Sequence, residues 1–456
     1  MRPCRAIPCL AVAFFLGGCS TPSPEPLRTP EPPVLALPAT DTPAPFPHEW
    51  WTLFGDPELD RLIALAREQN RDLAQAAARI DAARANARIA GADAALRLDA
   101  VGGLSRQRGF RNAGALSGHY QAKQFDAGLE LSYEVDLWGR VRALRTAAEK
   151  DLALTLQERA AAEISLCAQV ARFHLNRRAL RREAEIVRQQ LAQDTETERL
   201  LDIRASSGFA TDLDVERTRI EKATREGELA QLRESEQALA NALALFCGQS
   251  SSPSGSLADA NVTLPPVPNA LSLALLEARP DVAAKRSRWE AALARVQTAR
   301  AEFYPAVRLA GSFGYAAEHP EDLLEWRSRL WSLIGSLTAP VLDGGRLKGN
   351  LELAAAQLKE ASAAYESAVL TAYREVSDAL NASRALAEQQ TAAGQRLAAA
   401  DRALALSRER YDKGFATYLE VVDSTRSRLA AQRTLVQLDA ARQCAAVDLI
   451  RALGLP

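Results

Sequence analysis

The sequence predicts a mainly helical protein with a membrane-spanning β part, built from two copies of a unit in which two strands precede a long helix and a returning helix. Three observations predict this class: period-two alternation at 125–136, a helical stretch at 141–203 without Gly or Pro, and recurrence of the plan at a constant offset of 206 residues. The alternation is typical of a strand with one apolar and one polar face. The helical stretch corresponds to a rod of about 95 Å.

The internal duplication rests on two aligned segments. Val135–Val141 aligns with Val341–Leu347, and Gly-Phe-Ala-Thr at 208–211 recurs at 414–417. Because both pairs have the same offset, the helices between them have equal length. Chance similarity rarely preserves spacing over such a distance, so a duplicated unit is predicted.

The N-terminus predicts an export signal at 1–18. Arg2 and Arg5 give a positive start, an apolar core follows at 10–16, and small residues lead to Cys19. Leu-Gly-Gly-Cys at 16–19 resembles the lipobox of bacterial lipoproteins, which implies lipid attachment at Cys19; an ordinary secretory signal with a chance cysteine is the alternative. Ser20 rather than Asp after the cysteine implies sorting to the outer membrane. Ten prolines at 21–47 predict an extended tether over 19–47.

Composition excludes some functions. Lys and Arg number 56 against 57 Asp and Glu, so the formal charge of −1 gives no sign of nucleic-acid binding. No apolar run of eighteen residues follows the signal, so any membrane span of the mature chain is expected to be β.

The first repeat is expected at 48–247 and the second at 269–456, with a Ser-, Pro- and Gly-rich linker at 248–268. Paired tryptophans at 50 and 51 predict a buried anchor at the start of the fold. The expected elements of the first repeat are a helix at about 58–92, strands at 96–105 and 125–136 joined by a polar loop at 106–123, the long helix 141–203 and a helix at 211–246. Those of the second are a helix at about 271–303, strands at 307–315 and 331–341, the long helix 347–410 and a helix at 417–453.

Four strands of about ten residues can cross a bilayer when tilted, but they cannot close on themselves. Open edges in lipid would leave unpaired amides that cost several kcal/mol each, so chains must pool their strands. Two chains would give eight strands with a filled interior, whereas three would give twelve and leave a lumen. We therefore expect a homotrimer. A soluble sheet with one face on a core is the alternative.

Several motifs together resemble the outer-membrane efflux protein family, the trimeric channel-tunnels of tripartite export systems, and its lipoprotein branch. The motifs are the lipobox, Asp56-Pro57-Glu58-Leu59-Asp60 after the tryptophans, Asp136-Leu137-Trp138-Gly139-Arg140, Leu342-Asp343-Gly344-Gly345-Arg346, and Tyr411-Asp412-Lys413-Gly414 with Leu419-Glu420-Val421-Val422-Asp423. The resemblance covers nearly all of the mature chain. It implies a twelve-stranded β-barrel in the outer membrane above a twelve-helix α-barrel in the periplasm of a Gram-negative bacterium.

The resemblance also implies a function. It is that of a passive trans-periplasmic duct for substrates that an inner-membrane pump, most often of the RND type, delivers through a periplasmic adaptor. A type I protein-secretion channel and a helical adaptor or scaffold lipoprotein are the alternatives. The pump is a separate protein, and the sequence does not identify the substrate.

No catalytic, cofactor or metal site is expected. The four histidines at 48, 119, 174 and 319 are far apart in sequence and lack metal-ligand spacing. After the signal and Cys19, the remaining cysteines at 167, 247 and 444 stand singly in helices. They are expected to be buried small hydrophobes.

The residues expected to carry function lie at the two helical turns, which form the periplasmic mouth in the family. Acidic residues narrow the pore there, and the matching positions are Asp214, Glu420 and Asp423. Three copies would form rings of like charge that favour cations. Thr211 and Thr417 three residues earlier also fit capping boxes, so Asp214 and Glu420 stay open between gate and cap. Asp423 lies beyond the first turn and is the stronger gate candidate.

The resemblance adds a lock and an adaptor contact. Tyr411 and Asp214 match positions that hold the closed mouth by hydrogen bonding in some relatives, but an assisting arginine is Ala416 here. A weaker lock and a mouth that opens more readily are therefore expected. The adaptor is expected at Gly208, Phe209, Thr211, Gly414, Phe415 and Thr417; helix termination by glycine with a hydrophobic contact is the alternative for these turns.

Overall fold

The computed structural model describes residues 47, 49–111, 118–208, 210–250 and 277–454. All of them belong to one compact unit, Ala36–Pro456. The expected signal at 1–18, the lipid-attachment residue Cys19 and most of the tether and linker lie outside the described residues.

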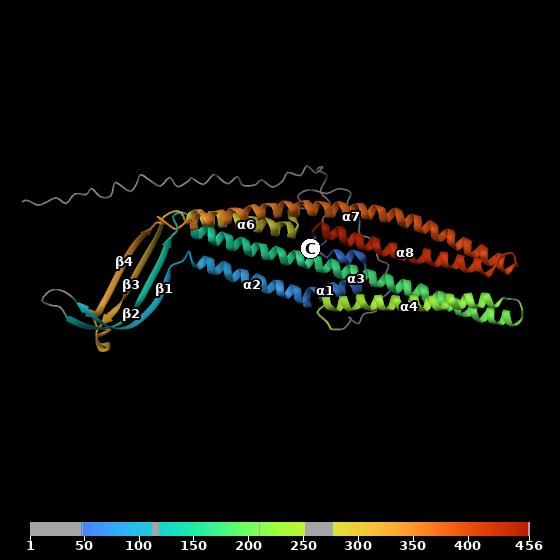
Figure 1. The fold of residues 1–456 in the computed structure, drawn as a ribbon, viewed down its shortest axis with the longest axis horizontal. Helices are drawn as coiled ribbons and strands as arrows, with labels where there is room; N and C mark the ends of the chain where they lie inside the picture. Colours follow the sequence, from blue (N-terminus) through green and yellow to red (C-terminus); the bar gives the residue numbers. More distant parts are fainter. Residues whose placement is uncertain (1–46, 48, 112–117, 209, 251–276, 455–456) are drawn as a thin grey trace, which may run out of the picture. The chain divides into compact units, whose positions relative to one another are not determined.

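The described chain is mainly helical, with four antiparallel strands contributed in pairs by two repeated halves (Figure 1). This confirms the expected fold class in its coarse form. The first half contains a short 3₁₀ helix at Trp50–Phe54, then α1 (Pro57–Gln69), α2 (Arg71–Ala92), β1 (Arg97–Arg111), β2 (Gly118–Val135), α3 (Arg140–Ser206) and α4 (Asp212–Phe246). The second contains α6 (Pro280–Ala301), β3 (Ala306–Ala317), β4 (Arg329–Thr338), α7 (Arg346–Asp412) and α8 (Tyr418–Ala452).

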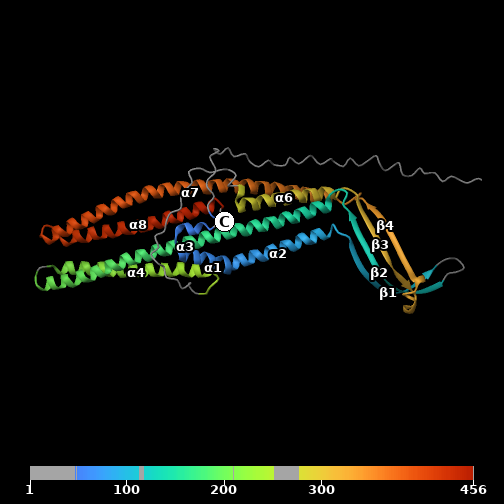
Figure 2. The same cartoon turned by 180° about the vertical axis from the view of Figure 1, so that it is seen from behind.

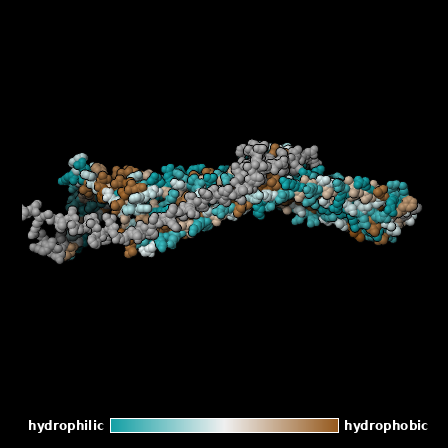
Figure 3. Space-filling model, turned by 90° about the horizontal axis from the view of Figure 1, so that it is seen from above, coloured by the Kyte–Doolittle hydropathy of each residue, from teal (hydrophilic) through white to brown (hydrophobic). Residues whose placement is uncertain are grey.

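The strands form one sheet in the order β1-β2-β3-β4, so the two halves meet at the β2–β3 pair. Leu104 lies opposite Phe125, and Leu129 lies opposite Phe313. Paired residues share a face, so the alternating apolar side chains all lie on the same side of the sheet. Figure 3 shows hydrophobic surface gathered over the strands.

The hairpin of β1 and β2 is longer than expected. The segment 106–123, expected as a polar loop, pairs from Arg106 opposite Lys123 to Arg111 opposite Gly118. The loop interpretation is wrong because backbone hydrogen bonds continue a ladder whatever the side chains are, whereas the apolar alternation ends with Leu104 and Phe125.

Both long helices begin in the same way. Gly139 and Gly345 precede α3 and α7 with φ of 78° and 87°, in the left-handed region that glycine favours. A carboxylate then caps each helix. Asp136 accepts from the amide of Val141 at 3.1 Å, and Asp343 accepts from the amide of Leu347 at 2.7 Å. The motifs at the junctions therefore act as helix starts.

The single helix expected at 58–92 is wrong, because the chain is extended at Asn70 (ψ 128°). The Asn70 carboxamide caps α2 by accepting from the Leu73 amide at 3.0 Å, and its Nδ2 donates to the carbonyl of Phe246 at 2.9 Å. The second half has a matching break before Pro280, where Arg279 Nη1 donates to the carbonyl of Ala452 at 2.6 Å. At each break, therefore, a side chain binds the C-terminal end of the returning helix of the same half.

Two glycines allow this close approach. Gly248 follows α4 with φ 66°, and a Cβ there would lie 2.4 Å from the carbonyl oxygen of Gln69. Gly454 follows α8 with φ 70°, and a Cβ there would lie 2.5 Å from Cγ of Arg279. Both the backbone conformation and the space therefore demand glycine.

A hydrophobic core joins the start of the fold to the helices. Trp50 and Trp51 are 1% and 5% exposed, as expected for a buried anchor, and they pack with Phe54, α1, α3 and the ends of α4 and α8. Contacts between elements centre on α3, which packs against α2, α4, α6 and α8, while α7 packs against α6 and α8 (Figure 2). Within the described ranges, no helix has the length and apolar character that crossing a membrane requires.

A buried polar cluster fixes the anchor to α3. Asp56 caps α1 by accepting from the Glu58 amide at 3.1 Å, while its Oδ2 lies 2.8 Å from His174 Nε2 and 2.5 Å from Arg178 Nη1. Burial alone would raise the pKa of Asp56. The hydrogen bond to His174 and the charges of His174 and Arg178 outweigh burial and lower the pKa of Asp56 to about 2.

Candidate functional site

The ends of the two helical hairpins, α3–α4 and α7–α8, hold the residues expected at the mouth. The α7–α8 turn is closed by Gly414 (φ 78°), and the Phe415 amide donates to the Arg410 carbonyl at 2.8 Å. Gly208 (φ 76°) stands at the equivalent place after α3. These glycines end their helices in the left-handed conformation. Phe415 is 74% exposed, and Phe209 lies outside the described residues.

Thr211 caps α4. Its hydroxyl oxygen accepts from the Asp214 amide at 3.2 Å, and the same hydroxyl lies 2.8 Å from Asp214 Oδ2, to which it donates. Arg217 Nη1 lies 3.8 Å from the carboxylate. Asp214 therefore has partners within its own helical turn, and its side chain is 17% exposed.

Thr417 occupies the N-cap of α8, but its side chain makes no capping hydrogen bond. Of the two roles that stayed open for Glu420, the capping box with Thr417 is therefore not formed. The Glu420 carboxylate lies 3.7 Å from Arg410 Nη1, on α7. It is therefore directed toward α7 and not toward the first backbone amides of α8. Glu420 and Asp423 are 45% and 61% exposed, and Asp423 lies 3.7 Å from Arg426 Nη1.

The expected lock between Tyr411 and Asp214 is absent among the hydrogen bonds of the described residues. Tyr411 instead packs against Tyr418, with ring centroids 5.5 Å apart. The Tyr418 hydroxyl lies 3.2 Å from the hydroxyl of Thr218 on α4, within hydrogen-bond distance. Burial raises the pKa of Tyr418. The tyrosine that joins the two hairpins is therefore Tyr418, which the sequence analysis did not single out.

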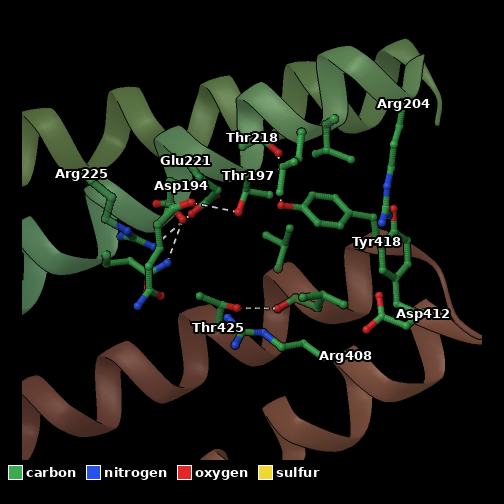
Figure 4. Close-up of a pocket in the computed structure, with 17 residues that line it drawn as sticks. Asp194, Thr197, Arg204, Thr218, Glu221, Arg225, Arg408, Asp412, Tyr418 and Thr425 are labelled. Atoms are coloured by element: carbon green, nitrogen blue, oxygen red, sulfur yellow. Dashed lines mark hydrogen bonds and ion pairs between the residues drawn. The ribbon is translucent and has the colours of Figure 1, made fainter. Parts of the chain in front are cut away.

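Behind these residues lies a cavity of about 260 Å³ between the two hairpins (Figure 4). All four hairpin helices contribute to its wall. The lining includes Asp194, Thr197 and Arg204 from α3, Thr218, Glu221 and Arg225 from α4, Arg408, Tyr411 and Asp412 from α7, and Tyr418 and Thr425 from α8. A hollow at this place allows the hairpins to shift against each other at a lower packing cost than in a filled core.

Two charged side chains of the cavity are incompletely paired. Asp194 Oδ1 accepts from Gln190 Nε2 at 2.7 Å, but the buried Oδ2 has no protein partner among the described residues. Burial raises the pKa of Asp194. Arg225 is 6% exposed and pairs with Glu221 at 3.0 Å and Glu228 at 3.1 Å, while its Nε has no partner within the described chain.

A row of ion pairs continues from the cavity along α4 and α8. Glu221 on α4 pairs with Arg426 on α8, and seven residues further along both helices Glu228 pairs with Arg433 at 3.2 Å. Arg433 also lies 3.2 Å from Glu183 of α3, which is 3% exposed. The sequence carried a signal for this row, since acids and arginines repeat at seven-residue spacing on α4 and α8. The spacing alone does not show which helices are neighbours.

The remaining cysteines, and the possibility of a metal site, can be assessed in the described part of the chain. No cluster of His, Cys, Asp and Glu there could hold a metal ion. Cys167, Cys247 and Cys444 are free and buried, as expected for small hydrophobes. Burial raises the pKa of the Cys167 thiol to about 12 and that of Cys444 to about 11, so neither thiol is activated.

Comparison with known proteins gives a consistent result. The family model described as "Outer membrane efflux protein" matches residues 62–249 and 271–455. Outer membrane protein OprJ of Pseudomonas aeruginosa is 35% identical over 99% of this chain and 96% of its own length. The probable outer membrane lipoprotein SilC of Salmonella typhimurium is 29% identical over 98% of this chain and 97% of its own. A crystal structure of a membrane protein from Pseudomonas aeruginosa, 34% identical, superposes with a TM-score of 0.85 over 93% of this chain and 96% of that one.

Proposed function

The chain belongs to the outer membrane efflux protein family and is an outer-membrane channel of efflux systems, and on that premise we propose that it works as a homotrimer whose mouth is set by the ends of the α3–α4 and α7–α8 hairpins. The observation that carries the proposal is the sheet. Its outer strands β1 and β4 each pair on one side only among the residues that the structure describes. An outer-membrane location makes such edges costly, and pairing between copies satisfies them.

The mass of the purified protein in detergent tests the trimer. We expect three copies per particle, with the β signal of the circular dichroism spectrum retained. A monomer with the full β signal would overturn the proposal, because its strand edges would then be satisfied without partner copies.

The charge at the mouth is assigned to Glu420 and Asp423. Both are exposed, whereas Asp214 is bound to the Thr211 hydroxyl and Tyr411 packs against Tyr418. Three copies would place rings of carboxylates at the entrance and favour cations. Asp423→Ala is expected to raise single-channel conductance in a planar bilayer and to weaken cation preference, and Glu420→Gln to do the same. Unchanged conductance and selectivity in both variants would refute the proposal that Glu420 and Asp423 form carboxylate rings at the entrance.

The resting mouth is held, in this proposal, by contacts from α8 to α4 in place of the lock between Tyr411 and Asp214. Tyr418 with Thr218 and Arg426 with Glu221 supply them. Tyr418→Phe removes only the hydroxyl, so open events should become more frequent in the same bilayer recordings. Tyr411→Phe is the matched control and should leave opening unchanged. If both variants raise the frequency of open events equally, the assignment of the contact to Tyr418 alone is refuted.

Partners follow from the family. We propose that a periplasmic adaptor contacts the turns at Gly208–Thr211 and Gly414–Thr417 and that an inner-membrane pump, of the RND type, drives export. Phe415, 74% exposed at a turn, supports an apolar contact there. We also propose Cys19 as the lipid-attachment site, in line with the lipoprotein SilC. Phe415→Ala should weaken crosslinking to the adaptor while the trimer persists, and crosslinking at the wild-type level would refute this contact.

A further inference from the structure

The outer end of the β1–β2 hairpin carries cations on the same face as the apolar side chains. Arg106 lies directly opposite Lys123, two residues beyond the pair of Leu104 and Phe125. Arg108 follows on the same face, because side chains two residues apart on a strand point to the same side. Arg106 and Lys123 therefore lie about 7 Å past the pair of Leu104 and Phe125, and Arg108 lies about 14 Å past it.

These three cations are exposed and have no acidic partner in the described chain. The whole segment 105–125 contains no Asp or Glu. Like charges directly opposite each other destabilise a strand pair, so the Arg106–Lys123 pair is unfavourable unless an anion lies between them. The cations on the opposite face, at the end of the sheet next to the helices, differ, since Arg97 pairs with Asp99 at 2.7 Å and Arg308 lies 3.7 Å from Glu134.

The apolar side chains below the cations are themselves uncovered. Leu98 and Leu104 are 57% and 70% exposed on β1, and Trp331 is 74% exposed on β4. At the other edge of the sheet Arg329 lies on the same face, opposite Tyr315, with its guanidinium 3.6 Å from the centroid of the Trp326 ring. A cationic border therefore adjoins an apolar band at both edges.

We propose that Arg106, Arg108 and Lys123 bind the phosphate groups of a phosphorylated lipid of the outer leaflet, whose acyl chains cover the apolar band. The three positive charges favour a ligand with phosphate groups. Because exposed apolar surface adjoins the cations, a phosphorylated lipid fits the site better than a soluble phosphate does. Such a site is independent of how the mouth opens and of what the channel exports.

The test is binding of bis-phosphorylated lipid A to the purified full chain in neutral detergent, measured by native mass spectrometry and by the rise in melting temperature. Each cation contributes about fivefold to the affinity for an anionic lipid. The triple variant with Arg106→Gln, Arg108→Gln and Lys123→Gln should therefore bind lipid A on the order of 100-fold more weakly. Arg106→Lys with Arg108→Lys keeps the charge and should keep binding. Arg97→Gln with Arg308→Gln is the control on the opposite face and at the other end of the sheet, and it should bind like wild type.

If the triple variant fails to fold, the single variant Lys123→Gln tests the same site. Without lipid its melting temperature should rise, because the like-charge pair is relieved, while its stabilisation by lipid A should fall. Dephosphorylated lipid A and inorganic phosphate should each stabilise the wild type far less than lipid A. The proposal is overturned if the triple variant binds lipid A within twofold of wild type, if the control loses as much binding, or if either alternative probe matches lipid A.

Discussion

Replacing Asp56 by Asn is expected to loosen the anchor at the start of the fold in a pH-dependent way. Asn can still accept the backbone amides of α1, but it brings no charge to His174 and Arg178. The native pKa of Asp56 is about 2 against an ordinary 3.8. That difference corresponds to about 2 kcal/mol of stability at neutral pH.

The sign follows from the lowered pKa. The contribution is present above the ordinary value of 3.8 and is lost as the pH falls through about 2. Thermal unfolding followed by circular dichroism at 222 nm, from pH 7 to pH 2, should therefore show a difference between wild type and variant that is about 2 kcal/mol at pH 5–7 and shrinks toward pH 2. Asp81→Asn, whose side chain is 74% exposed, should change little. A difference that stays constant over this range would refute the charge-based explanation.

Three further outcomes are expected in the same melts. Thr211→Ala should cost about 1 kcal/mol because a formed cap is lost, whereas Thr417→Ala should cost less since no side-chain cap exists there; equal losses would contradict this. Asp194→Asn should stabilise the protein at neutral pH and not at pH 3, because burial raises the pKa of Asp194 and the charged form is the costly one; a loss of stability at pH 7 would count against it. Gly454→Ala should destabilise strongly, whereas Gly227→Ala, in open space inside α4, should be neutral or stabilising by up to about 1 kcal/mol; similar effects would disprove the close packing at Gly454.

The parts of the fold that could be predicted from the sequence depend on local rules. Alternation at Phe125 and its neighbours predicted a strand, and the uninterrupted helical composition after Gly139 predicted a long helix, because both patterns express one element facing one environment. The equal spacing of Gly208 and Gly414 from those starts predicted the matching turns. The first two signals lie within the element that they predict, and the third depends only on spacing along the chain.

What could not be predicted depends on partners distant in sequence. The helix break at Asn70 is stabilised by the Phe246 carbonyl, 176 residues away, and nothing local at Asn70 separates a cap from an exposed side chain. The same holds for the ends of the two hairpins. Tyr418 and Thr218 are 200 residues apart, and their contact depends on a tertiary structure that brings side chains of α4 and α8 within reach of each other. The local motif at Glu420 fits two roles because it does not contain Arg410, the partner of Glu420 on α7.

The row of ion pairs between α4 and α8 repeats every seven residues, with Glu221 meeting Arg426 and Glu228 meeting Arg433. Seven residues of helix correspond to about 10.5 Å along the axis. Both pairs depend on the same register of α8 against α4, so a shift of α8 by a fraction of that distance would lengthen both of them at once. The two pairs therefore favour one register of the two hairpins, and a change of register has to separate them together.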